Sequence, residues 1–84
     1  MVVHGRVQGV GFRYSVARAA RTRGIAGTVR NRRDGAVEVV FEGDPEGVES
    51  LVRLCHDGPR GAEVERVDVE EEEPEGLDGF SVDG

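Results

Sequence analysis

The sequence predicts an α+β fold in which two helices cover one face of a single antiparallel sheet. The prediction rests on three observations: two segments carry apolar residues at helical spacing, other segments are short and rich in valine, and glycine or proline separates most of them. In chain order the elements run β-α-β-β-α-β. That order is satisfied by a ferredoxin-like sandwich, and the chain length of 84 residues predicts one domain over residues 1–84.

The first part of the chain supplies two strands and a helix. Residues 2–7 are short and rich in β-branched side chains, which predicts a strand. From Phe12 the apolar residues recur at helical spacing, and Gly24 suits the C′ position at which a helix ends. Residues 25–31 predict the second strand, and the Asp-Gly pair at 34–35 is typical of a hairpin turn.

A third strand and a second helix follow. Residues 36–42 alternate between apolar and mainly acidic side chains, which predicts a strand with one buried and one solvent-exposed face. Asp44 suits an N-cap and Pro45 suits the first helical position, so we expect a helix to begin there. Apolar residues recur at helical spacing as far as Cys55, and Gly58 ends the helix.

The end of the chain predicts a fourth strand and a short last one. Val67 and Val69 alternate with charged residues, and we expect this strand to continue through Glu70–Glu73. The glutamates would then be a solvated strand end that protects the sheet edge from pairing, and a cation site is the alternative. Residues 80–82 are expected to form the last strand.

Composition and charge limit the classes of function. The chain has 11 basic and 17 acidic residues, and its isoelectric point near 4.8 argues against a nucleic-acid-binding protein. Residues 1–33 hold eight arginines and no acid, which suggests an anionic ligand near the front half, while biased codon usage and solvated helix faces account for most of the eight. Cys55 is the only cysteine, so a disulfide framework is excluded. With no apolar run long enough for a signal peptide or a membrane span, we expect a cytoplasmic protein.

The segment that joins the first strand to the first helix is the main functional candidate. Gly9 and Gly11 allow the backbone to curl so that successive N–H groups form a concave nest for an anion. The helix that follows adds its own unpaired N–H groups. Arg13 lies in the first helical turn, where its guanidinium can bond two phosphate oxygens at once. From these residues alone, an ordinary glycine-containing turn is an equal alternative.

Two blocks of sequence resemble the signatures of the acylphosphatase family. The first is Gly-Arg-Val-Gln-Gly-Val-Gly-Phe-Arg at residues 5–13, and the second is Gly-Thr-Val-Arg-Asn at residues 27–31. The resemblance extends to Glu-Gly-Leu-Asp-Gly-Phe at residues 75–80 and so covers nearly the whole chain. Thr28 departs from the family, which has a bulky aromatic residue there, and this affects the expected efficiency more than the identity.

The resemblance implies a metal-free enzyme that hydrolyses the carboxyl–phosphate bond of small acyl phosphates to a carboxylate and inorganic phosphate. Arg13 would bind the phosphate, and Asn31 at the end of the second strand would orient the attacking water. A monomer without cofactor, metal, nucleic acid or membrane contact is expected. The loop backbone would cradle the phosphate, with substrate contacts at Gln8, Gly9, Val10, Gly11, Phe12 and Arg13.

An acyl phosphate suits so small a set of groups, because its leaving group is a carboxylate of low pKa. Positioning and charge stabilisation can then account for the rate. Neither block contains a histidine or a carboxylate, so the resemblance implies that the substrate's own phosphate accepts the proton of the water. The amide of Asn31 has both an acceptor and a donor and can orient a water without taking its proton.

Two other functions fit parts of the pattern. An RNA-recognition domain shares the element order, but its glycine–aromatic motif belongs on the third strand, where this chain has Glu38 and Glu42. A phosphate-binding or carbamoyl-phosphate-handling module, similar to a domain of larger hydrogenase-maturation proteins, stays open. We interpret His4, His56 and Cys55 as structural. Three arginines in the predicted hairpin either steer anions or are exposed charges: Arg30, Arg32 and Arg33.

Overall fold

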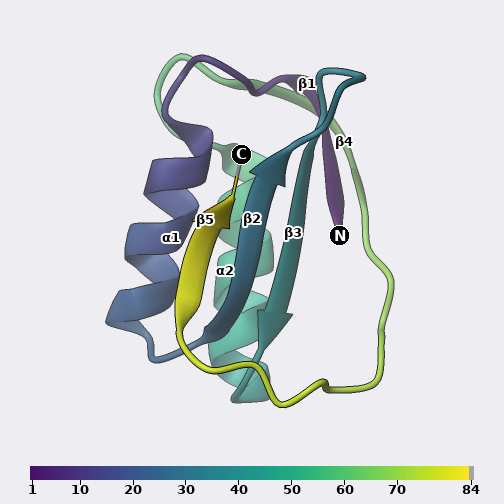
Figure 1. The fold of residues 1–84 in the computed structure, drawn as a ribbon. Coiled ribbons are helices and arrows are strands. Elements are labelled where there is room, and N and C mark those ends of the chain that lie inside the picture. Colours follow the sequence, from purple (N-terminus) through teal and green to yellow (C-terminus); the bar gives the residue numbers. More distant parts are fainter. Residues whose placement is uncertain (84) are drawn as a thin grey trace.

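In the computed structural model, which describes residues 1–83, five strands form one sheet and two helices cover one of its faces (Figure 1). The order along the sheet is β4-β1-β3-β2-β5. This arrangement confirms the predicted ferredoxin-like sandwich. The strands are β1 (Val2–Arg6), β2 (Ala26–Asn31), β3 (Val37–Glu42), β4 (Glu63–Asp68) and β5 (Phe80–Asp83), and the helices are α1 (Phe12–Thr22) and α2 (Pro45–Asp57).

The sheet is mixed, whereas the sequence predicted an antiparallel one. The pairs β1–β3, β1–β4 and β2–β3 are antiparallel as expected, but β5 pairs parallel to β2. The reason is the connection of residues 69–79, which carries the chain from β4 at one edge of the sheet to β5 at the other (Figure 1). A strand that is reached by such a crossover can align parallel with its neighbour.

The fourth strand ends earlier than predicted. β4 covers Glu63–Asp68, so Glu70–Glu73 lie in the exposed connection, and the prediction that the strand continues through them is wrong. The limit is set by the partner strand, because Asp68 pairs with Val2, the first residue of β1. Beyond that pair β1 offers no further strand residue, and the glutamates have no ladder to join.

The core lies between the sheet and the helices and is apolar throughout. No buried side chain in residues 1–83 is polar or charged. Each fully buried valine or leucine contributes about 1.5–3 kcal/mol through the surface removed from water. Functional groups must therefore lie at the surface. The core side chains include Val3, Val29, Val37 and Val39 from the strands and Phe12, Val16, Ala20, Leu51 and Cys55 from the helices.

Candidate active site

The loop between β1 and α1 has the alternating backbone of an anion nest. The dihedral φ is +74° at Gly9 and +77° at Gly11, whereas no non-glycine residue in the described chain has a positive φ, so Gln8, Val10 and Phe12 have the opposite sign. This alternation turns successive N–H groups toward one side. Among residues 1–83, no protein acceptor is bonded to the N–H groups of the two glycines or of Val10.

Helix α1 begins beside this nest without a side-chain cap. Its N-cap is Gly11, and no acid lies in the first turn. Helix α2 is different, because the carboxylate of Asp44 accepts a hydrogen bond from the N–H of Gly47 at 3.3 Å. The first N–H groups of α1, with their partial positive charge, are therefore directed at whatever anion the loop admits.

Arg13 lies in the first turn of α1 and contacts the end of β5. Its Nη1 donates a hydrogen bond to the carbonyl oxygen of Asp83 at 3.1 Å. Asp83 lies beside Arg30 in the parallel pairing of β5 with β2. The guanidinium is therefore at the end of the sheet where β2 ends with Asn31.

Asn31 is the last residue of β2, and it has a buried acceptor. Its Oδ1 is shielded from solvent, and no donor in residues 1–83 is bonded to it. A buried acceptor without a donor costs on the order of 1–3 kcal/mol. A donor that reaches Oδ1 after the side chain turns would remove that cost.

The side chain of Gln8 connects the glycine loop to the hairpin between β2 and β3. Its Nε2 donates to the carbonyl oxygens of Arg32 at 2.7 Å and of Ala36 at 3.0 Å. The side chain therefore points toward the hairpin, and only the backbone of Gln8 is available to the nest. Likewise Phe12 is buried in the core, so its backbone is the part near the loop.

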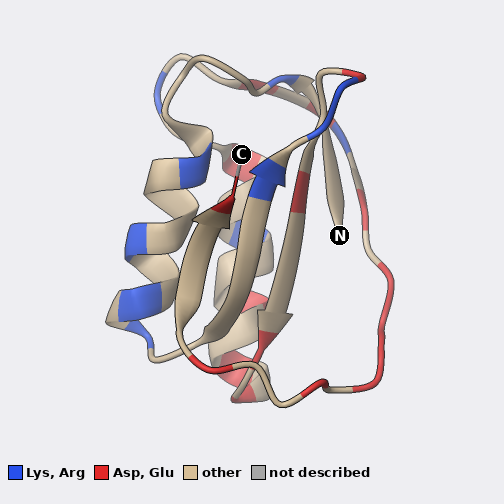
Figure 2. Cartoon of the chain, viewed as in Figure 1, with Lys and Arg blue, Asp and Glu red and all other residues tan. Residues whose placement is uncertain are grey.

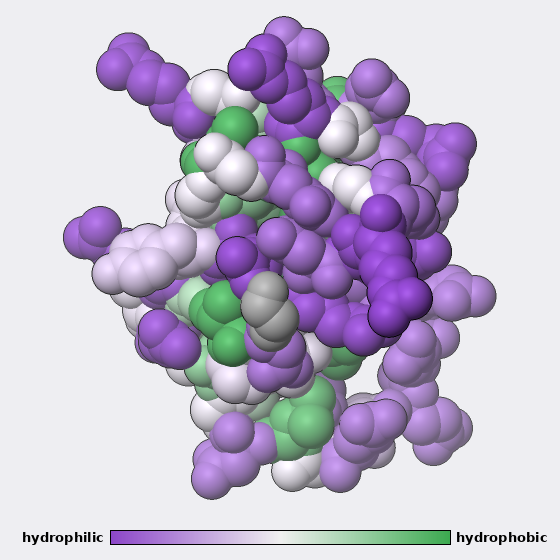
Figure 3. All heavy atoms as spheres, turned by 45° about the horizontal axis from the view of Figure 1, so that its top comes forward, coloured by the Kyte–Doolittle hydropathy of each residue, from purple (hydrophilic) through white to green (hydrophobic). Residues whose placement is uncertain are grey.

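The structure thus places the predicted site residues together at one end of the sheet (Figure 1). The loop of residues 8–11, Arg13 and Asn31 lie at the end of the sheet where β1, β2 and β5 have their carboxyl ends and α1 has its amino end. Figure 3 brings this end forward and shows hydrophilic side chains over most of the face. Sequence reasoning missed the contact of Arg13 with Asp83, because a backbone carbonyl acceptor leaves no signal in a sequence.

The arginines of the hairpin are mostly paired. Arg30 contacts Glu38 at 3.1 Å, and Arg32 contacts the carboxylate of Asp34 at 3.1 Å. The pKa of Asp34 is lowered, first by the hydrogen bond from the N–H of Ala36 and further by Arg32. Figure 2 shows basic residues along α1 and near the end of β2, and acidic residues along the connection of residues 69–79. The candidate site is therefore close to several arginines, of which Arg30 and Arg32 are paired with carboxylates.

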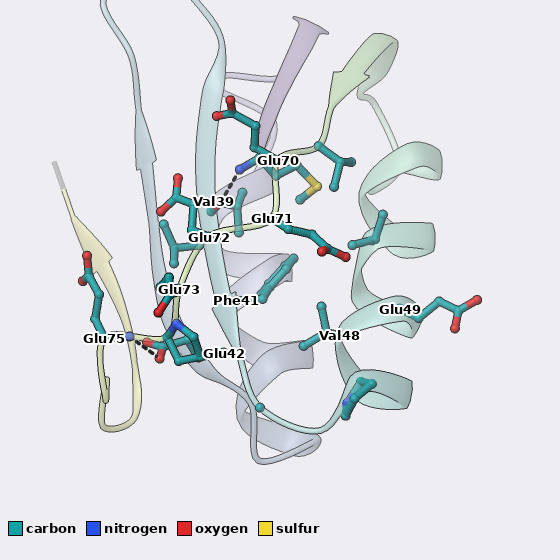
Figure 4. A pocket seen from close by; sticks show the side chains of 17 residues that line it. Val39, Phe41, Glu42, Val48, Glu49, Glu70, Glu71, Glu72, Glu73 and Glu75 are labelled. Carbon is teal, nitrogen blue, oxygen red and sulfur yellow. Dashed lines mark hydrogen bonds between the residues drawn. The ribbon is translucent and has the colours of Figure 1, made fainter.

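A hollow between β3, α2 and the connection is a poor phosphate site. Phe41 and Val48 line it, and its rim carries the glutamates of residues 70–75 (Figure 4). The carboxylate of Glu42 fixes the connection by accepting the N–H groups of residues 75–77 at 2.8–3.1 Å. The negative potential of these glutamates opposes the entry of a dianion.

The remaining candidates do not form a metal centre or a nucleophile. Within residues 1–83, no three His, Cys, Asp or Glu side chains are grouped closely enough to hold a metal ion. His4 pairs with Asp68 at 3.0 Å, and His56 is exposed in the last turn of α2. Burial raises the pKa of Cys55 to about 12, so its thiol stays protonated at neutral pH. Over the same residues, neither helix has the length and apolarity needed to cross a membrane.

The chain is similar to acylphosphatases over nearly its whole length. The acylphosphatase family model matches residues 1–82, and an acylphosphatase of Thermococcus kodakarensis is 60% identical over 82 residues, which are 98% of this chain and 90% of the relative. The crystal structure of the Bacillus subtilis acylphosphatase has a TM-score of 0.92 at 40% identity, covering 99% of this chain and 93% of the other. Full-length HypF, in its phosphate- and nucleotide-bound form, matches 99% of this chain with 11% of its own length, at a TM-score of 0.90 and 28% identity. With two sequence signatures, a shared fold and these relatives, the chain belongs to the acylphosphatase family.

Proposed function

We propose that this protein is a metal-independent acylphosphatase, in which Arg13 binds the phosphate of an acyl phosphate and Asn31 orients the attacking water. The observation that carries the proposal is the meeting of three features at one end of the sheet. These are the nest of N–H groups, the guanidinium, and an Asn31 Oδ1 to which no group in residues 1–83 donates. The first two suit a dianion, and the third suits a water.

The backbone of residues 8–13 forms the phosphate site in this proposal. Its N–H groups and the amino end of α1 neutralise the phosphate without any titratable group. Each hydrogen bond to a charged oxygen contributes about 1.5–3 kcal/mol. The bond from Arg13 to the carbonyl of Asp83 orients the guanidinium before the substrate arrives, which reduces the entropy cost of binding.

Asn31 supports the hydrolytic step by placing a water. Oδ1 is closed to water in the ligand-free conformation, so the carboxamide has to turn before it accepts one O–H of the water and the water oxygen faces phosphorus. As the P–O bond from the water forms, the bond to the carboxyl oxygen breaks and the carboxylate departs with the electron pair. The proton of the water passes to a phosphate oxygen. Positioning and charge stabilisation account for the rate in this scheme.

The test follows hydrolysis of acetyl phosphate in the presence of EDTA. We expect turnover that survives chelation and is inhibited competitively by inorganic phosphate. Arg13→Ala is expected to weaken substrate binding and lower the rate together. Asn31→Ala is expected to lower kcat by on the order of 100-fold while phosphate affinity stays nearly intact, because it removes only the positioning of the water.

Arg18→Ala is the matched control for Arg13→Ala, since Arg18 is an exposed arginine of the same helix. It is expected to keep the parental kinetics. Parental turnover by Asn31→Ala would refute the role of Asn31. Phosphate binding without any hydrolysis by the parent protein would instead favour a binding-only module.

We further propose a single-domain monomer that acts in the cytoplasm on small molecules and not on nucleic acid. The isoelectric point near 4.8 opposes binding to a polyanion. Phe80 is only 7% exposed and Phe41 packs against the core, so these sheet aromatics do not form an exposed platform for stacked bases. Size-exclusion chromatography with light scattering and a nucleic-acid binding assay test both points.

A further inference from the structure

We infer that Gln8 is a positioning residue, whose side chain holds the phosphate loop and the water-orienting Asn31 at a fixed separation. The inference rests on the proposed function, because it concerns the two halves of that site. One half is the nest of residues 8–11 and the other is the end of β2. The described contacts join them through a single side-chain amide, the Nε2 of Gln8.

The geometry of the amide is specific. An amide nitrogen carries two hydrogens, and both are used, one on the carbonyl of Arg32 at 2.7 Å and one on the carbonyl of Ala36 at 3.0 Å. Arg32 follows Asn31 directly in the chain. The amide of Gln8 is therefore bonded to the carbonyl of the residue that directly follows the one it would position.

The hairpin does not need these bonds for its own hydrogen bonding. The carbonyl of Ala36 already accepts the N–H of Arg32 at 2.8 Å, and the carbonyl of Arg32 accepts the N–H of Gly35 at 3.3 Å. A carbonyl oxygen has two lone pairs, and Gln8 occupies the second one on each. Removing the amide of Gln8 therefore leaves no carbonyl without a partner, and the main loss is the connection between hairpin and loop.

The phosphate half has separate supports. Arg13 is bonded to the carbonyl of Asp83, and the carbonyl of Gly11 accepts the N–H of Ser15 at 3.0 Å. We therefore expect the nest to keep its shape when Gln8 is replaced. What changes is the position of Asn31 relative to the bound phosphate. The predicted signature is a loss in kcat with little loss in phosphate affinity.

The experiment compares Gln8→Glu, which keeps the size but presents no amide donors, with Gln8→Met, which is similar in length and apolar. Val48→Ala is the control. Val48 packs against the core from α2, so its replacement lowers the stability of the fold without touching the loop or the hairpin. For both Gln8 variants we expect kcat for acetyl phosphate to fall about 10-fold or more. For Gln8→Met, which places no negative charge beside the anion, we expect the inhibition constant of inorganic phosphate to stay within about twofold. The control is expected to change neither value.

A double-mutant cycle tests whether Gln8 acts through Asn31. The kcat loss of Gln8→Met is expected to disappear in an Asn31→Ala background, since there is no positioned water left to displace. An equal loss in both backgrounds overturns the inference. A large rise in the phosphate inhibition constant of the uncharged Gln8→Met variant also overturns it, because Gln8 would then serve the nest itself.

A further readout does not depend on turnover. In ¹⁵N–¹H spectra of the ligand-free protein, the uncharged Gln8→Met variant is expected to shift the side-chain amide pair of Asn31, whereas Val48→Ala leaves it in place. An unshifted pair overturns the inference whether or not acyl phosphates are hydrolysed. A shifted pair in a protein without any hydrolysis refutes the proposed function and supports the coupling.

Discussion

Replacing Gly11 with alanine separates backbone strain from phosphate binding. Gly11 has φ +77°, and a Cβ added there would meet no atom within 4 Å, so the cost is conformational and not steric. Gly24 at the end of α1 is a matched site, with φ +66° and the same open surroundings. A left-handed conformation costs a non-glycine residue about 1–2 kcal/mol, so both variants should lose a similar free energy of unfolding. For a domain of this size, each kcal/mol corresponds to about 4–8 °C in Tm.

The two variants should differ in phosphate affinity. If the alanine of the Gly11→Ala variant leaves the left-handed region, the alternation of φ ends and one N–H turns away from the anion. Losing one charge-assisted hydrogen bond of about 1.5–3 kcal/mol weakens binding roughly 10- to 150-fold. Gly24→Ala should leave affinity unchanged, because Gly24 lies at the other end of α1.

The assay combines thermal unfolding with the inhibition constant of inorganic phosphate at a temperature where both variants are folded. The reasoning fails if Gly11→Ala binds phosphate as tightly as the parent, since the nest would then contribute nothing. It also fails if Gly24→Ala weakens binding to the same extent, because the effect would then follow from lost stability alone.

Other substitutions test the fold and its titrating groups. Phe80→Ala should lower the free energy of unfolding by about 3–5 kcal/mol in urea denaturation, because its side chain is only 7% exposed; a loss well under 1 kcal/mol would mean that β5 is not anchored in the core. The lowered pKa of Asp34 stabilises the fold at pH values above 3.8, the pKa of the unfolded chain, and this stabilisation is lost as the pH falls through the lower pKa of the folded state. Asp34→Asn should therefore reduce the fall of the urea denaturation midpoint at acid pH. An unchanged fall would count against the contacts with Ala36 and Arg32. Cys55 should react with a thiol reagent at neutral pH only after denaturant is added, and rapid labelling of the native protein would contradict its burial.

Elements with local signals were predicted well from the sequence. The end of α1 is one case, because Gly24 takes the left-handed conformation expected of a C′ glycine. The hairpin is another, since Asp34 accepts the N–H of Ala36 within the turn between β2 and β3. Asp44 and Pro45 begin α2 as predicted. In each case the residues that decide the structure are neighbours in the chain.

Features that depend on distant partners were missed or only half predicted. The end of β4 is set by the length of β1, and the direction of β5 is set by the crossover from the opposite edge. The site shows the same division. The two signature blocks point to Arg13 and Asn31, but the contacts of Gln8 and Arg13 use backbone carbonyl oxygens, which every residue has. No pattern of residue types marks such an acceptor.

The apolar core has a consequence for how this scaffold tolerates change. Because no residue classed as buried in residues 1–83 is polar or charged, most of the folding energy comes from a core that is separate from the strand ends, and the residues at those ends can change while the core is retained. The backbone shared with HypF at 28% identity is what such independence would produce. A design that keeps the valine-rich core could therefore replace the residues at the strand ends with others that bind a different anion, while the fold is retained.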